Sequence, residues 1–223
     1  METTIDETAA ESAMEARAAG LVYETLAEAL LNVPDERILS DVARVADVLG
    51  AEGLDRFEAS ADLEQRYFDR FFVPSSPYFV PLSESCLRGS AVVDGGRRYG
   101  PTAGPDIDHV EQCYRSWSFE LSSLTGYPLA VKTLRADSLA SELAFAALLA
   151  QAESEARSED EAKRCRTWRG RFVNRHLARW ADQAAEAVAE TDDDFFARLC
   201  ALVAAWVSFD QRGLAARTDS ANA

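Results

Sequence analysis

The sequence predicts an all-α protein, a single helical bundle with a long Pro/Gly-rich loop between the third and fourth helices. Apolar residues recur at intervals of three and four along most of the chain, which is the spacing of one helix face. No run of alternating residues is long enough for a convincing strand. The length of 223 residues suits one domain with one core. We expect that domain to span residues 1–213, followed by a flexible C-terminal tail over residues 214–223.

The first part of the chain contains three predicted helices. An apolar stripe over residues 14–30 stops before Pro34, because proline cannot continue a helix interior. A second stripe over residues 39–49 is closed by Gly50, a residue typical of helix C-termini. A third stripe covers residues 63–71 and also ends before a proline.

The segment from residue 73 to residue 105 contains ten of the eighteen Gly and Pro residues of the chain. A loop of this length is uncommon in a compact domain and is usually functional or mobile. Its first part, VPSSPYFVPLSESC, is rich in aromatic and apolar side chains, so we expect it to pack on the bundle. Its second part, RGSAVVDGGRRYGPTAG, is expected to be exposed and flexible.

Four further helical segments are predicted, over residues 107–117, 139–150, 173–188 and 199–206. Asp137 directly precedes the second of them and is expected to be its N-cap. Asp192, Asp193 and Asp194 precede the last one and suit a helix N-terminus by capping and by the helix dipole.

The charge balance excludes some classes of partner. There are 38 acidic and 23 basic residues, so the net charge is −15, which argues against binding nucleic acid or an anionic membrane surface. Only two of the basic residues are lysines, Lys132 and Lys163. An acidic, nearly lysine-free chain is what we expect of a halophilic protein in a salt-rich cytosol, although a high-GC genome would also favour Arg.

The N-terminal segment predicts a cytoplasmic protein. The first twenty residues hold five acidic residues and a single Arg, the reverse of the basic start of a signal peptide. No apolar run approaches the ~20 residues that a membrane-spanning helix needs.

Few residues suit catalysis. The chain has two histidines, and its four cysteines form no CxxC pair, so they are expected to be buried thiols. Asp106, Asp108 and His109 are one possible metal-ligating set, but acidic residues after Pro105 also suit the first turn of a helix. The sequence therefore predicts no catalytic residue, no metal and no cofactor. The alternative is a metal-dependent helical enzyme or regulator that uses Asp106, Asp108 and His109, and a third possibility is a helical interaction module with unrelated partners.

Glu142 lies on a predicted helix that is otherwise apolar on most sides, where a carboxylate is costly. A capping role for Asp137 and a buried pair of Glu142 with an Arg would explain both acids without any binding function.

Several motifs in order resemble the TorD/DmsD/NarJ-like family of cytoplasmic chaperones for molybdenum-containing redox enzymes. They are the helix LEQRYFDRFFVP, a Pro-rich loop with the Glu84-Ser85 pair, Tyr114 followed by Gly126, the segment ADSLASELAF, and NRHLARW. The family's Asp-His pair is replaced here by Asp137-Ser138. The resemblance covers roughly residues 20 to 210.

The resemblance implies an all-α chaperone that is not an enzyme. It implies binding of the twin-arginine signal peptide and the apo form of a molybdopterin oxidoreductase during cofactor insertion and before export. No nucleic acid and no stable membrane association are expected, and a homodimer is possible. The residues that we expect to bind the client and its signal peptide are Tyr78, Glu84, Ser85, Tyr114, Asp137, Glu142 and Phe145.

Overall fold

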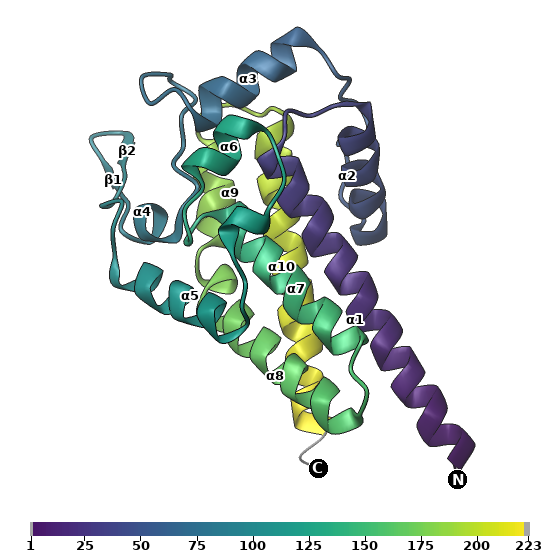
Figure 1. Cartoon of the computed structure of the whole chain (residues 1–223). Helices are drawn as coiled ribbons and strands as arrows, with labels where there is room; N and C mark the ends of the chain where they lie inside the picture. The colour runs from purple at the N-terminus through teal and green to yellow at the C-terminus, as the bar shows by residue number, and fades with distance from the viewer. Residues whose placement is uncertain (1, 221–223) are drawn as a thin grey trace.

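The computed structural model describes the backbone of residues 2–220 and the side chains of residues 10–217. Four long helices run alongside one another and form the body of the molecule (Figure 1). They are α1 (Glu2–Leu31), α7 (Leu139–Ser154), α8 (Glu159–Arg175) and α10 (Phe195–Ser220). Predicted helices therefore correspond to the main elements of the bundle.

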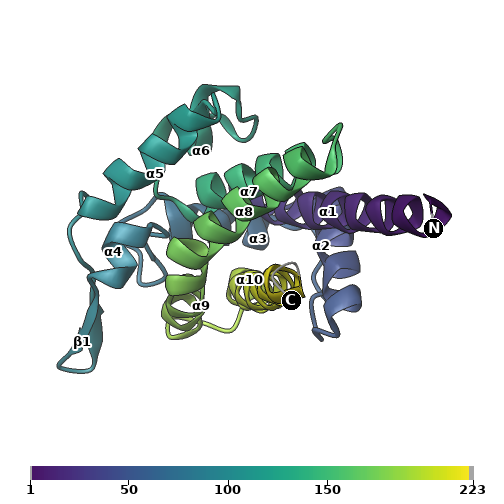
Figure 2. The same ribbon diagram turned by 90° about the horizontal axis from the view of Figure 1, so that it is seen from below.

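Helix α7 lies at the centre of the bundle and packs against both α1 and α8. Its side chains are apolar on most sides, and Leu143, Phe145 and Leu149 are fully buried. Seen from below, α1, α7 and α8 lie between α5 and α6 on one side and α10 and α2 on the other (Figure 2).

Local capping signals set the ends of the shorter N-terminal helices. The Asp35 side chain accepts the N–H of Ile38 at the start of α2 (Glu36–Leu49), and Gly50 ends that helix with φ of 66°. The hydroxyl of Ser60 caps α3 (Ala61–Phe71) in the same way. The predicted boundaries of these helices are confirmed to within a few residues.

The Pro/Gly-rich loop is more ordered than the sequence predicts. It contains a short helix, α4 (Glu84–Arg88), and an antiparallel hairpin of β1 (Ala91–Val93) and β2 (Gly96–Arg98). Asp94 and Gly95 connect the strands with φ of 51° and 80°, the backbone that two-residue hairpin turns require. The expectation of a flexible second part is corrected to a hairpin, because Asp-Gly between short apolar and polar runs favours this turn.

The hairpin is also held by an ion pair from the middle residue of β2. Arg97 forms an ion pair with Glu190, with 2.6 Å between the guanidinium and the carboxylate. After the hairpin come α5 (Pro105–Ser116), the 3₁₀ turn η1 (Leu121–Ser123) and α6 (Pro128–Thr133). Helix α5 confirms the segment predicted over residues 107–117, whereas η1 and α6 were not predicted.

The predicted helix over residues 173–188 is wrong as one continuous element. Helix α8 ends at Arg175, the 3₁₀ turn η2 spans Leu177–Arg179, and α9 spans Ala181–Ala189. His176 and Trp180 have non-helical backbone angles and fully buried side chains. The chain therefore turns at the two residues whose polar rings point into the interior.

Helix α10 begins where the acidic run ends. Asp194 accepts the N–H groups of Phe196 and Ala197, so the capping role predicted for this run is carried by its last residue. The domain boundary at residue 213 stays a prediction, and α10 continues past it to Ser220 with Leu214 buried.

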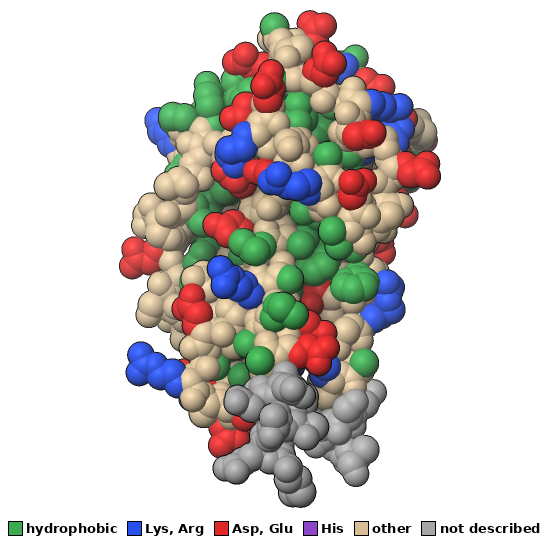
Figure 3. Space-filling model, turned by 90° about the vertical axis from the view of Figure 1, so that its right-hand side faces the viewer, with side chains coloured by type: hydrophobic (Ala, Val, Ile, Leu, Met, Phe, Trp, Pro, Cys, Tyr) green, Lys and Arg blue, Asp and Glu red, His purple; other side chains and the backbone are tan. Residues whose placement is uncertain are grey.

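The fold class is confirmed as all-α, with the two-stranded hairpin as the sheet of the described residues. Acidic side chains are spread over the face of the molecule that Figure 3 shows, with basic and hydrophobic side chains between them. Within the described residues, no helix is both long enough and apolar enough to cross a membrane.

Candidate functional site

The loop before α4 is joined to the start of α7 by backbone hydrogen bonds. The N–H of Glu84 donates to the Asp137 carbonyl at 2.8 Å, and the N–H of Leu139 donates to the Leu82 carbonyl at 3.0 Å. The Asp137 carboxylate accepts the N–H of Ser85 at 3.2 Å. Segments about fifty residues apart thus meet in one short bridge.

The N-cap role predicted for Asp137 is corrected by this geometry. The hydroxyl of Ser138 caps α7 by accepting the N–H of Ser141. Asp137 instead accepts from the first turn of α4 and lies beside Arg135, with 3.2 Å between Arg135 Nε and the carboxylate. The Asp137 carboxylate therefore holds the first turn of α4 and not that of α7.

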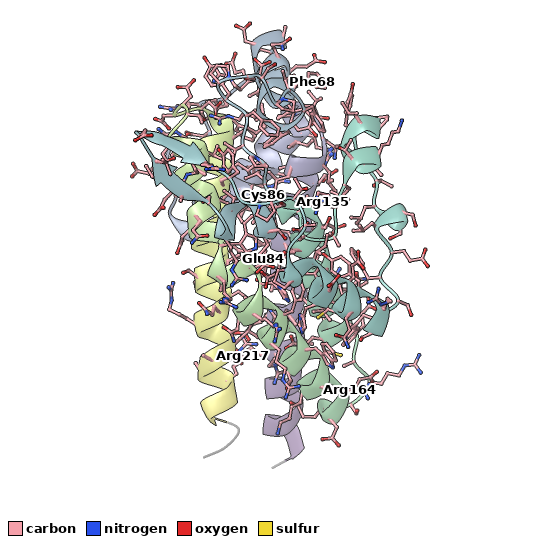
Figure 4. The ribbon with its side chains drawn as sticks, turned by 90° about the vertical axis from the view of Figure 1, so that its left-hand side faces the viewer. Phe68, Glu84, Cys86, Arg135, Arg164 and Arg217 are labelled. Atoms are coloured by element: carbon pink, nitrogen blue, oxygen red, sulfur yellow. The ribbon has the colours of Figure 1, made fainter. Side chains whose placement is uncertain are left out.

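Four ionisable side chains at this junction are completely buried: Glu84, Asp137, Glu142 and His176. Glu84 has two partners, because its Oε2 lies 2.7 Å from His176 Nδ1 and its Oε1 lies 2.9 Å from Arg88. Arg88 also pairs with Asp106 at 2.7 Å. Figure 4 shows Glu84 inside the molecule, below Cys86 and Arg135. Both oxygens of this buried carboxylate therefore have a partner, as buried polar groups require.

Glu142 has a different environment. Its Oε2 accepts the indole N–H of Trp180 at 3.0 Å, and its Oε1 has no hydrogen-bond partner among the described residues. Burial raises the pKa of Glu142 well above its ordinary value, and the nearby carboxylates of Glu84 and Asp137 raise that pKa further. The pair with an Arg that would have explained Glu142 is therefore replaced by a bond to an indole, and the arrangement favours a neutral acid.

The cluster continues to the second histidine of the chain. His176 Nε2 lies 2.8 Å from His109 Nδ1, and the two rings stack with their centroids 5.0 Å apart. Burial lowers the pKa of His109, and the positive charge of Arg175 lowers it further. With the Nδ1 proton of His176 donated to Glu84, its Nε2 accepts the Nδ1 proton of neutral His109. The result is a continuous chain from Glu84 to His109.

Tyr114 and Phe145, two aromatic residues of the predicted site, pack against each other beside the buried acids. The Tyr114 hydroxyl donates to the Ala136 carbonyl at 2.8 Å, and the Tyr114 and Phe145 rings have centroids 4.8 Å apart. Ser85 is buried beside the loop, and its hydroxyl has no partner among the described residues. Tyr78 is separate, because its ring stacks under Arg66 of α3 at 3.5 Å. The structure thus brings six of the seven predicted residues together and leaves Tyr78 apart.

The set Asp106, Asp108 and His109 is not brought together. Asp106 pairs with Arg88, Asp108 is exposed, and His109 faces His176. The three residues share the first turns of α5 but point to different neighbours, so that alternative loses its ligand set.

Sequence reasoning missed the two histidines as partners of the acids. The sequence places His176 in the NRHLARW motif without indicating a partner. The available signal is its position among the apolar residues Phe172, Val173 and Leu177, because a polar ring on a buried helix face needs a partner inside the core.

A groove on the surface lies between α1 and α7, is also lined by residues 123–125 at the end of η1, and has a volume of about 910 Å³. Met14, Leu21 and Leu148 form part of its apolar wall. Its charged lining residues are Arg17, Glu24, Glu28 and Glu155, so acidic groups outnumber basic ones. No groove of this kind was predicted, because its two walls are more than a hundred residues apart in the sequence.

The chain was compared with protein families, with curated proteins and with solved structures. Residues 13–186 match the family model described as nitrate reductase delta subunit. The comparisons with curated proteins and with solved structures give no significant match. The match covers well over half of the chain and agrees with the motifs found in the sequence. The chain therefore belongs to the nitrate reductase delta subunit family, a family of chaperones for the maturation of molybdenum enzymes.

Proposed function

We propose that this protein is a cytoplasmic chaperone that binds the twin-arginine signal peptide and the apo form of a molybdopterin oxidoreductase while the cofactor is inserted. The observation that carries the proposal is the family match over residues 13–186. The client is then a molybdenum-enzyme subunit, and the chaperone itself is not an enzyme.

The chemistry of a signal peptide supports the groove between α1 and α7 as the binding surface. Such a peptide has a basic start followed by an apolar stretch, so its receptor needs acidic groups beside an apolar wall. The groove offers both, with Leu21 more than half exposed and Glu24 one turn further along α1. The net charge of −15 also favours approach of a basic peptide.

Most of the residues predicted to bind the client have a structural role in this proposal. Six of them are buried instead of forming the outer surface: Glu84, Ser85, Tyr114, Asp137, Glu142 and Phe145. Glu84, Ser85 and Asp137 hold the loop against the bundle. Tyr78 lies on the partly exposed segment between α3 and α4 and remains a candidate for direct contact.

Titration of a labelled twin-arginine leader peptide tests the proposal. Leu21→Asp places a charge in the groove, whereas Val48→Asp makes the same change at an exposed position of α2 outside it. Burying a leucine-sized side chain contributes ~1.5–3 kcal/mol, so we expect Leu21→Asp to weaken binding roughly tenfold or more. Val48→Asp should bind as the wild type does.

Three outcomes contradict parts of the proposal. Failure of the wild type to bind the leader peptide, or equal binding of a leader with both arginines replaced by Gln, overturns the function. Equal binding by Leu21→Asp and Val48→Asp overturns the groove. Loss of binding in Glu142→Gln with an intact fold moves the contact site to the buried cluster.

A further inference from the structure

The outer end of the histidine chain carries a feature that the proposed function does not use. His109 Nδ1, Cys113 Sγ and His176 Nε2 all lie within 4.8 Å of one another. His109 and Cys113 are four residues apart and therefore share one face of α5, while His176 follows the end of α8. We propose that these three side chains bind one borderline-soft divalent transition-metal ion of the zinc(II) type.

The ligand set suits such an ion. Two imidazole nitrogens and one thiolate form a common set for zinc, which leaves a fourth position for water or another ligand. Zinc–nitrogen bonds of ~2.0–2.1 Å and a zinc–sulfur bond of ~2.3 Å place tetrahedral ligand atoms roughly 3.3–3.6 Å apart. The distance from Cys113 Sγ to His109 Nδ1 is 3.7 Å and already fits. The two ring nitrogens are 2.8 Å apart, so their rings must separate by about half an ångström to admit the ion.

His176 is oriented as a metal-binding histidine usually is. Its other nitrogen donates to the fully buried Glu84 carboxylate at 2.7 Å, which fixes the tautomer and aims the Nε2 lone pair at His109 and Cys113. Glu84 is here a positioning residue. Metal binding then moves the His109 proton from Nδ1 to Nε2, so that the imidazole stays neutral, and the thiol proton of Cys113 leaves to solvent.

The site has an access path. His109 and Cys113 line a cavity of about 620 Å³ between α5 and α8. The same cavity is lined by Arg171 and Arg175, whose positive charges oppose a cation. The Cys113 thiolate and the Glu84 carboxylate behind His176 offset that charge, and the two arginines favour an anionic group at the fourth position.

A second possible set lies deeper, formed by Glu84, Glu142 and His176. All three side chains are fully buried, and they do not line the cavity. The outer set has the softer ligands and the path from solvent, so it is the one that we assign.

Cobalt(II) and zinc(II) are the probes for the test, added to the full chain with its thiols kept reduced. We expect one cobalt ion per chain, a sulfur-to-cobalt charge-transfer band and a tetrahedral ligand-field spectrum, both lost when zinc is added. Cys113→Ser should lose the charge-transfer band and weaken zinc binding by more than roughly 100-fold, since even outer-shell changes cost 10–100-fold. Cys165→Ser, a matched change of a buried thiol on α8, should keep both.

Zinc should also raise the thermal unfolding midpoint of the wild type and of Cys165→Ser, because the ion joins α5 to the end of α8. It should leave the midpoint of Cys113→Ser unchanged, and this comparison holds even if the serine variant is less stable. Absence of stoichiometric cobalt binding by the wild type overturns the proposal. An unchanged cobalt spectrum in Cys113→Ser also overturns it, and loss of the ion in Glu142→Gln but not in Cys113→Ser assigns the deeper set instead.

Discussion

The buried cluster favours protonation of Glu142, because burial raises the pKa of this carboxyl well above its ordinary value. Glu84 has Arg88 and His176 as partners, whereas Glu142 has the neutral indole of Trp180. The nearby Glu84 carboxylate adds to the effect of burial, and both favour the neutral form of Glu142 in the folded protein. This preference has a measurable consequence for stability.

Glu142→Gln is expected to change the pH dependence of stability. The pKa of Glu142 is raised in the folded state by burial and by Glu84, above an unfolded value of about 4.3. A raised pKa stabilises the fold below the unfolded pKa, and this contribution is lost as the pH rises toward the folded pKa. Each pH unit in that window costs the wild type up to about 1.4 kcal/mol, a cost that the amide avoids.

The measurement is the unfolding free energy of both proteins from about pH 4 upward. The difference between Glu142→Gln and the wild type should shift in favour of the variant as the pH rises. The exposed Glu155→Gln, which lies at the C-terminal end of the same helix, is the control and should show no such trend. Parallel pH profiles for Glu142→Gln and the wild type would mean that Glu142 is ionised in the folded state.

At the scale of elements, the hairpin loop is fixed to α4 by two glycines. The N–H of Gly100 donates to the Cys86 carbonyl at 2.8 Å, where the loop returns past Gly89. A Cβ at Gly100 would lie 2.8 Å from the Gly89 Cα and 3.0 Å from the Ser85 carbonyl oxygen. Backbone atoms cannot move aside as a flexible side chain does, so this crossing requires glycine.

Gly100→Ala should therefore destabilise the protein by ~1–3 kcal/mol, the usual cost of overpacking. The matched control is Gly96→Ala in β2, where a Cβ would have its nearest neighbour at 4.0 Å. Urea unfolding of the two variants gives the comparison. Equal stability of Gly100→Ala and Gly96→Ala would show that the crossing is loose enough to accept a methyl group.

Some features of the helices and turns follow from residues that are neighbours in the sequence, and others do not. The helix caps at Asp35, Ser60 and Gly50 were predictable, because each depends on residues within one turn. The Asp94-Gly95 turn also depends on neighbouring residues, since Asp-Gly favours a hairpin turn, although its strands of three residues are too short to show a clear alternation. The break between α8 and α9 had no Gly or Pro to mark it, because it follows from the burial of His176 and Trp180.

The candidate site was predictable only in part. Motif order identified Glu84, Asp137 and Glu142, which the fold brings together. Their partners came from elsewhere: His176 is 92 residues from Glu84, and His109 is 67 residues from His176. No period or spacing in the sequence reports contacts over such separations. The alternative metal site of Asp106, Asp108 and His109 was wrong for the same reason. It combined residues that are neighbours in the sequence but whose side chains face different partners.

At the scale of the whole molecule, charge is the dominant unbalanced feature. Surface ion pairs join several arginines to acidic residues, for example Arg37 with Glu28 and Arg66 with Asp192. Exposed pairs of this kind contribute little each, and they leave most of the acidic excess uncompensated. On the face that Figure 3 shows, the acidic side chains are spread out instead of lying in one patch, so their repulsion is not confined to one site.

The folded protein is therefore expected to need salt for full stability. At about 0.01 M salt the Debye length is ~30 Å, comparable to the size of the domain. The acidic side chains behind the net charge of −15 then repel one another with little screening. At about 1 M the length falls to ~3 Å, so only contacting charges still interact. We expect the thermal unfolding midpoint to fall on desalting and to recover in molar KCl, because the loss of net repulsion outweighs the weakening of exposed ion pairs.

Sucrose at matched osmolality is the control for this salt effect, because it stabilises by exclusion from the protein surface and not by screening. Recovery in sucrose equal to that in KCl would contradict the electrostatic cause. Equal midpoints at low and high KCl would show that the acidic surface carries no destabilising repulsion.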